Sequence, residues 1–281
     1  MTGMNTTTLP SIFVSHGSPM IALEPREAGR FMQQLGRDIV ARWGRPRGVI
    51  VASAHSLTRQ PTLLAAPRHA AVYDFGNFDP RLNTLRYDAP GAPALATQAQ
   101  ALLQDAGIPA QRLDEGGLDH GIWTVLRYLF PEADIPVLPL AWPPHWSPAQ
   151  LFALGVALQP LAGEGVLIVG SGSITHNLGR VFAGGRMLAV DQPVTPQSAA
   201  FREWFAERTA AADWPALFDW RQQAPHAVLM HPTDEHLLPW FVAAGAGGPD
   251  LPGRRIHASF THSDLGMDAY AFGVTAAELR P

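Results

Sequence analysis

Short runs of apolar residues alternate along this chain with longer segments of helical periodicity, and this alternation most constrains the fold. Strands are predicted where β-branched residues cluster, at residues 12–14, 49–52, 62–66, 137–140, 166–169, 256–260 and 270–274. Helices are predicted at residues 26–43, 94–106, 121–130, 147–161, 196–212 and 235–244. Because most of the strands are apolar along their whole length, they favour a mostly parallel sheet covered by helices on both faces.

The same pattern predicts how the chain is organised. No internal repeat, charge block or obvious linker interrupts the 281 residues. We therefore expect a single three-layer α/β/α domain over residues 1–281, with residues 1–9 as a flexible N-terminal tail. Residues 68–93 are rich in Asp, Gly, Asn and Pro and are expected to form mostly an ordered loop.

Two missing residue types exclude several kinds of chemistry. The chain has no Cys, so it has no disulfide framework, thiolate nucleophile or Cys-ligated metal. All 20 of its basic residues are Arg, and the lack of Lys excludes the Walker phosphate-binding lysine and every Schiff-base mechanism.

Charge and hydropathy bear on partners and location. The formal net charge is −4 and the Arg residues are scattered, so no nucleic-acid binding is expected. No secretory signal is visible in residues 1–10, and no apolar run approaches the length of a membrane span. The sequence therefore predicts a soluble, cytoplasmic protein that binds no membrane.

Histidines follow three of the predicted strands. His16, His55 and His176 come after strands 12–14, 49–52 and 166–169, each with Ser, Ala or Gly nearby. In open α/β sheets the ligand crevice lies outside the carboxyl ends of the strands, so these imidazoles are expected to converge. Two more histidines, His120 and His236, lie at predicted helix starts.

Such a group of histidines predicts a metal site. A single histidine after a strand is usually a loop residue, but three at equivalent strand ends favour a metal. Without Cys, the ligands would be imidazole, carboxylate and water, which suit Fe(II), Zn, Mn or Ni. Lone carboxylates are usually solvated or capping, yet Asp74, Asp119 and Glu235 are candidates for acid–base work. The remaining histidines are interpreted as ordinary surface or core residues, namely His69, His145, His226, His257 and His262, while the role of His231 stays open.

Other motifs fail on inspection. Gly170-Ser171-Gly172 follows a strand like a dinucleotide-binding turn, but Thr175 stands where the third glycine belongs. Ser171 and Ser173 lack the glycine spacing of a nucleophile elbow, and no zinc-protease motif is present.

Five motifs in order together resemble a known family. They are Ser-His-Gly-Ser-Pro at residues 15–19, Ser-Ala-His at 53–55, Gly-Leu-Asp-His-Gly at 117–121, Gly-Ser-Gly-Ser-Ile-Thr-His-Asn at 170–177 and His-Pro-Thr-Asp-Glu-His at 231–236. Over roughly residues 10–275 the chain resembles the DOPA-type extradiol aromatic ring-opening dioxygenases of the class III, LigB-like superfamily. One departure is Ser56, which stands where the family usually has Trp, so the substrate pocket is expected to differ in shape.

The resemblance implies a mononuclear Fe(II) site, sometimes occupied by Zn(II), that opens a catechol ring beside its two hydroxyls with O2. In it, His16, His55 and His236 match the metal ligands. His176 matches a residue treated either as an additional ligand or as the active-site base. His120 matches a second active-site histidine near the substrate.

Two alternatives to a dioxygenase remain open at this point. A site made only of imidazoles would also suit a zinc-dependent hydrolase on the same scaffold, since zinc-bound water reaches a pKa of about 7. The unusual Ser56 is also compatible with a metal-binding protein without turnover.

Overall fold

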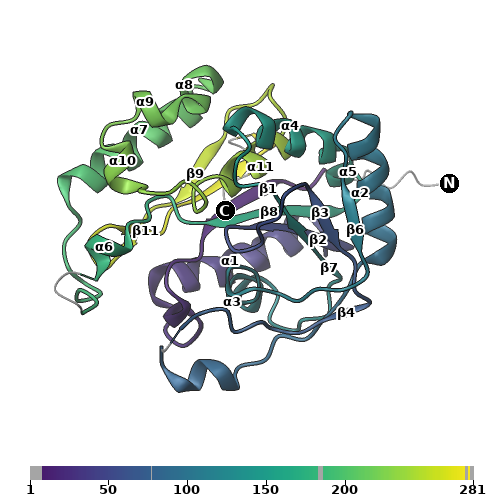
Figure 1. Ribbon diagram of the computed structural model, residues 1–281, viewed down its shortest axis with the longest axis horizontal. Coiled ribbons are helices and arrows are strands. Elements are labelled where there is room, and N and C mark those ends of the chain that lie inside the picture. The colour runs from purple at the N-terminus through teal and green to yellow at the C-terminus, as the bar shows by residue number, and fades with distance from the viewer. Residues whose placement is uncertain (1–7, 77, 183–185, 276–277, 279–281) are drawn as a thin grey trace.

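The central sheet sets the plan of the molecule. The computed structural model describes residues 8–76, 78–182, 186–275 and 278. Its eight-stranded sheet has the order β6-β3-β7-β2-β8-β1-β12-β9 (Figure 1). The strands are β1 Ser11–Ser15, β2 Gly48–Ser53, β3 Thr62–Leu64, β6 Gln111–Leu113, β7 Val137–Ala141, β8 Val166–Gly172, β9 Arg254–His257 and β12 Ala269–Phe272. Two small ladders pair β4 Arg68–His69 with β5 Ala89–Pro90 and β10 Phe260–Thr261 with β11 Leu265–Gly266.

The middle of the sheet is parallel and its edges are mixed. Strands β7, β2, β8 and β1 run in one direction. At one edge β12 is antiparallel to β1, and at the other β3 is antiparallel to β7. The prediction of a mostly parallel sheet is therefore confirmed.

Side-chain alternation along the strands produces two buried layers. Ile12 and Val14 in β1 pack in the cluster that contains residues of α1 Arg26–Trp43 and α3 His120–Leu129. Phe13, which points to the opposite face, packs with residues of α2 Pro93–Asp105, α4 Pro148–Leu158 and α11 Pro239–Ala246. In Figure 1, α1 and α3 lie on one side of the sheet, and α4 and α11 lie on the other. The three-layer α/β/α arrangement is thus confirmed.

The other helices are short, apart from α7. They are η1 Pro19–Ala22, η2 Pro80–Thr84, α5 Pro160–Gly163, α6 Leu178–Val181, α7 Pro196–Ala210, α8 Trp214–Phe218, α9 Trp220–Gln223 and α10 Ala227–Met230. Helices α7 to α10 gather at the opposite end of the molecule from α2 (Figure 1). Within the described residues, no helix has both the length and the apolar character needed to cross a membrane.

Two glycines of β8 allow the start of α11 and the turn before it to approach the sheet closely. A Cβ atom at Gly170 would lie 2.2 Å from the carbonyl oxygen of Pro239, and one at Gly172 would lie 2.0 Å from that of His236. Only glycine fits at such distances. The close contact brings His236 to the carboxyl end of β8.

Two predicted helices have different limits in the structure. The helix predicted at residues 147–161 is divided into α4 and α5, because Pro160 has no N–H to continue the helical ladder and begins a new turn. The helix predicted at 235–244 begins only at Pro239, which stands at its first position. His236 therefore lies in the turn before a helix and not in its first turn.

Two smaller predictions also need correction. The strand predicted at residues 256–260 is two strands, β9 and β10, which belong to different ladders. Leu9 is not part of a free tail, since it is buried and its N–H donates to the carbonyl of Ala162. Residues 1–7 of the predicted tail lie outside the described residues. The short strand β6 was not predicted at all. The extent of a single domain over residues 1–281 stays a prediction.

Candidate active site

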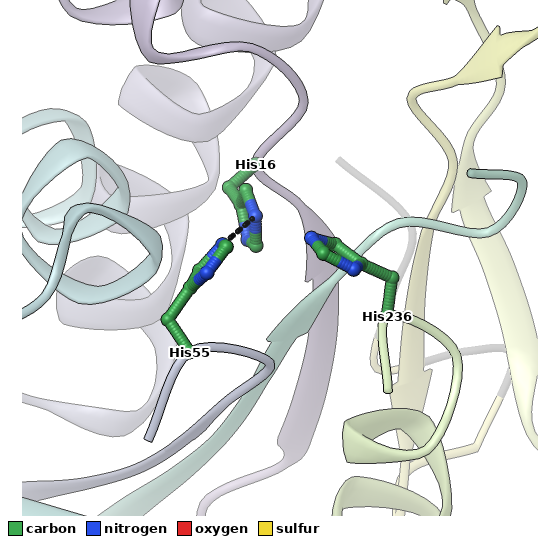
Figure 2. Close-up of side chains that lie close together, drawn as sticks. All are labelled: His16, His55 and His236. Carbon is green, nitrogen blue, oxygen red and sulfur yellow. Dashed lines mark hydrogen bonds between the residues drawn. The ribbon is translucent and has the colours of Figure 1, made fainter. Parts of the chain in front are cut away.

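The carboxyl ends of the central strands bring the first histidines together. β1 and β2 both pair in parallel with β8, with Ser15 opposite Gly172 and Ser53 opposite Ser171. His16 directly follows β1, and His55 follows β2 by two residues. Their imidazoles therefore meet at one edge of the sheet, as predicted. In Figure 2, His236 faces these two rings from the opposite side.

These three histidines form a compact cluster of ring nitrogens. One ring nitrogen from each of His16, His55 and His236 lies within 4.8 Å of the others. The Nε2 atoms of His16 and His55 are 3.1 Å apart. His16 and His236 are buried and His55 is half-buried. The arrangement could hold one metal ion.

Ser171 fixes the protonation of the His16 ring. Its hydroxyl donates to the carbonyl of Gly121 at 2.5 Å, so its oxygen is free to accept from His16 Nδ1 at 2.9 Å. With the proton on Nδ1, the Nε2 atom carries a lone pair directed at the cluster.

His236 is oriented in the same way by its neighbour. Its Nδ1 atom donates to Oε1 of Glu235 at 3.1 Å, which leaves the lone pair on Nε2. Burial raises the pKa of the Glu235 carboxyl, but the hydrogen bonds from His236, from a backbone N–H and from Thr233, with the charge interaction with His236, together outweigh burial and bring the pKa to about 2. Glu235 is therefore a carboxylate that supports the ring.

The histidines of the cluster are held neutral. Burial lowers the pKa of His55 to about 3, with further lowering by His120 and His236. Burial lowers the pKa of His16 well below its usual value and also lowers that of His236. Neutral imidazoles keep the lone pairs that a cation needs, so the donor set fits a divalent metal ion.

His120 forms a dyad with an acidic residue at the other side of the cluster. Both its backbone N–H and its Nδ1 atom donate to Oδ1 of Asp74, each at 2.9 Å. Burial raises the pKa of Asp74, but hydrogen bonding to His120 lowers it below the usual range overall. The His120 ring centroid lies 3.9 Å from that of His55. Because Nδ1 carries the proton shared with Asp74, the lone pair of the His120 ring is on Nε2.

His176 lies beside the three-histidine cluster, against the ring of His236. Its ring stacks on that of His236 with a centroid distance of 3.5 Å and an angle of 8°. It groups with Glu235 and His236, and not with His16 and His55. Burial and then His236 lower the pKa of His176 to about 2, so the ring is neutral.

Ser56, the departure from the family pattern, belongs to a buried hydrogen-bond network. Its hydroxyl donates to Oδ2 of Asp119 at 2.5 Å, and the hydroxyl of Ser53 donates to Oδ1 at 2.6 Å. Burial raises the pKa of Asp119, against the effect of these two hydrogen bonds. The Ser53 oxygen also accepts from the backbone N–H of His55 at 3.2 Å. The network supports the loop that carries His55.

A pocket of about 230 Å³ opens beside the histidines. His55, His120, His176 and His236 supply its polar wall. The apolar wall contains Phe75, Phe78, Val181, Phe182, Met187 and Leu265. These residues come from four separate segments, namely the loop before η2, the end of α6, the loop before α7 and strand β11, and their place in a pocket was not predicted from the sequence. We name this space the active pocket.

The remaining histidines have structural environments. His231, whose role the sequence left open, donates from Nε2 to the carbonyl of Ile174 at 2.9 Å and is fully buried. This bond braces the loop that leads to His176. The five histidines interpreted as ordinary belong to none of the possible metal groups among the described residues.

The fold and the site are those of an α/β enzyme with a possible histidine metal site beside an apolar pocket. Comparison with known proteins supports this description of the fold and the site. The family model for the catalytic LigB subunit of aromatic ring-opening dioxygenase matches residues 10–273. A protein of Beta vulgaris named 4,5-DOPA dioxygenase extradiol is 36% identical over 94% of this chain and 97% of its own length. One of the same name from Escherichia coli K12 is 34% identical over 86% of this chain and 87% of its own.

A solved structure agrees as well. The crystal structure of an uncharacterized protein from Escherichia coli K12 superposes with a TM-score of 0.77 at 30% identity, covering 94% of this chain and all of that one.

The chain belongs to the LigB family of aromatic ring-opening dioxygenases. It is an extradiol dioxygenase, a metal-dependent oxidoreductase that takes O2 and an aromatic substrate. The resemblance seen in the sequence is thereby confirmed, and neither the hydrolase nor the binding protein without turnover is supported.

Proposed function

We propose that this enzyme opens a catechol-type ring next to its two hydroxyls, using Fe(II) held by His16, His55 and His236. The observation that carries the proposal is the convergence of these three ring nitrogens beside a largely apolar pocket. Three nitrogen ligands suit Fe(II), with Zn(II) as another possible occupant, and they leave coordination positions open for substrate. Relatives are named for 4,5-DOPA, which makes DOPA-like catechols the first substrates to test.

When bound, Fe(II) would supply acidification of the substrate hydroxyls and the electron transfer to O2. The chain's own residues supply ligands, proton transfer and the exclusion of water. The walls around Phe75 and Phe78 suit the flat face of an aromatic ring and keep water from it.

We assign proton transfer to His120. Its Nε2 atom is the free position of a ring whose Nδ1 is bonded to Asp74, so it can accept a substrate hydroxyl proton. The Asp74 carboxylate would then stabilise the imidazolium that results. This is the arrangement by which a buried acid orients a histidine base.

We assign His176 to the bound substrate and not to the metal. It lines the active pocket, and its ring is parallel to His236. The lone pair of an imidazole lies in the plane of its ring. Because the two stacked rings are parallel, their lone pairs lie in parallel planes and cannot both point at one metal ion. His176 would therefore donate or accept a hydrogen bond at the substrate.

The test is reconstitution of metal-free protein. Anaerobic loading with Fe(II), followed by DOPA, protocatechuate or 4-methylcatechol in air, should give a yellow ring-opened product with one O2 consumed per product. Zn(II)-loaded protein is the matched control and should consume no O2. No O2 uptake by the Fe(II) form across the catechol panel would refute the proposal. A location in the cytoplasm stays a prediction, which cell fractionation tests.

A further inference from the structure

A second pocket adjoins the active pocket. It has a volume of about 200 Å³, and two of its lining residues, Ser18 and Met187, also line the active pocket. Gly17, which lines the active pocket, also lies against Met267, which lines the second pocket, because a Cβ at Gly17 would lie 2.6 Å from the Met267 sulfur. Ser18 and Met187 line both spaces, so the two pockets meet at these residues.

The lining of the second pocket is largely apolar. It contains Met20, Ile21, Met187, Val190 and Met267. Methionine side chains are unbranched and adapt to the shape of a ligand. The charged residues Glu24 and Arg26 also line this pocket, but their side chains are 47% exposed and form an ion pair at 2.6 Å. They form a rim whose charges are already paired.

The active pocket offers little to a charged group. Among the described residues that line it, none is Asp, Glu or Arg. A carboxylate and an ammonium on the substrate would lose their hydration there, and no lining side chain of opposite charge would replace it, which is unfavourable.

We propose that the second pocket, here called the substituent pocket, binds an uncharged apolar substituent on the catechol ring. The preferred substrates are then alkyl- or aryl-substituted catechols, and not catechol amino acids. The inference rests on the proposed ring-opening function and narrows its substrate class. The ring lies against the histidines, and the substituent passes Met187 to reach the pocket lined by Val190 and Met267.

The decisive comparison is between DOPA and 4-propylcatechol, which has a three-carbon chain of the same length but no charges. The Fe(II)-loaded enzyme should show a kcat/KM at least about tenfold higher for 4-propylcatechol. From 4-methyl- to 4-hexylcatechol, kcat/KM should rise by about fourfold for each methylene group, until the pocket is full. An equal or higher kcat/KM for DOPA, or no dependence on chain length, would overturn the inference.

A pair of variants locates the effect. Val190→Trp fills the substituent pocket and should lower the ratio of kcat/KM for hexyl- over methylcatechol at least about fivefold. Val228→Trp is the matched control, because Val228 is 67% exposed and lines neither pocket, and it should leave the ratio unchanged. An unchanged ratio in folded Val190→Trp would contradict the assignment of the pocket. The substrate series on the unaltered enzyme decides the matter if that variant does not fold.

A binding measurement separates this inference from the proposed function. Calorimetric titration of metal-free protein with 4-alkylphenols should show affinity rising by the same factor per methylene group. Chain-length-dependent binding without ring opening of any catechol would refute the proposed function and support the pocket. Ring opening with no chain-length dependence in either assay would refute the pocket and leave the function standing.

Discussion

Replacing Ser171 with Ala tests how the protein prepares His16 to bind a metal. Ser171 is fully buried, donates to the Gly121 carbonyl and accepts from His16 Nδ1. Without the hydroxyl, the ring loses the acceptor that holds its proton on Nδ1. Nothing then favours the tautomer with a free Nε2, or the orientation that aims it at His55 and His236.

The expected magnitude follows from these two bonds. Loss of a partner that orients a ligating histidine usually weakens metal affinity by about 10- to 100-fold. The His16 Nδ1–H is left without its acceptor in a buried place, at about 1–3 kcal/mol, whereas the Gly121 carbonyl lies inside helix α3 and loses only the added bond from Ser171. Ser171→Ala should therefore lower both metal affinity and the free energy of unfolding.

Ser173→Ala is the matched control. Ser173 is also fully buried, and its hydroxyl donates to the Thr175 carbonyl at 2.8 Å, so its loss also destabilises the protein. Its side chain has no hydrogen bond to a histidine of the cluster. Competition with a chromophoric zinc chelator gives the dissociation constant of each variant, and thermal unfolding gives its stability. Equal zinc affinity in the two variants would refute the assigned role of Ser171.

Three other predictions concern ligation, pH and packing. His55→Ala should lose most bound metal, whereas His120→Gln should keep its metal and turn over about 10²- to 10⁴-fold more slowly. Full metal content and activity in His55→Ala would show that the metal ligands are wrongly assigned. Burial lowers the pKa of His231 to about 4, below the 6.5 of the unfolded chain. The stabilisation that depends on a neutral His231 ring is therefore complete above pH 6.5 and is lost as the pH falls toward 4. In metal-free His231→Gln, the free energy of unfolding measured with denaturant should rise less steeply with pH in that window, by up to about 1.4 kcal/mol per pH unit. A slope equal to that of the unaltered protein would count against burial of a neutral ring. Gly172→Ala should reduce the free energy of unfolding by about 1–3 kcal/mol and weaken zinc binding, since its Cβ would collide with the His236 carbonyl. Gly163→Ala is the control and should do neither, because the nearest atom to its Cβ would be 4.0 Å away.

Local patterns determined much of the fold and part of the site. Helix α1 has the predicted limits Arg26 and Trp43, because its apolar face follows the helical period. Strands β1, β2 and β8 were predicted from apolar runs that are buried on both faces. Since parallel strands end at the same edge, the sequence alone also predicted that His16 and His55 would meet there.

Contacts between segments far apart in the chain depended on the tertiary structure. His236 reaches the cluster from a turn, not from the predicted helix, because Gly172 lets that turn come close to β8. The pairing of Asp74 with His120 and the pocket wall around Phe75 and Met187 join loops with no common period or spacing. Periodicity records only which face of an element is buried, whereas the shape of a pocket depends on how those faces pack together.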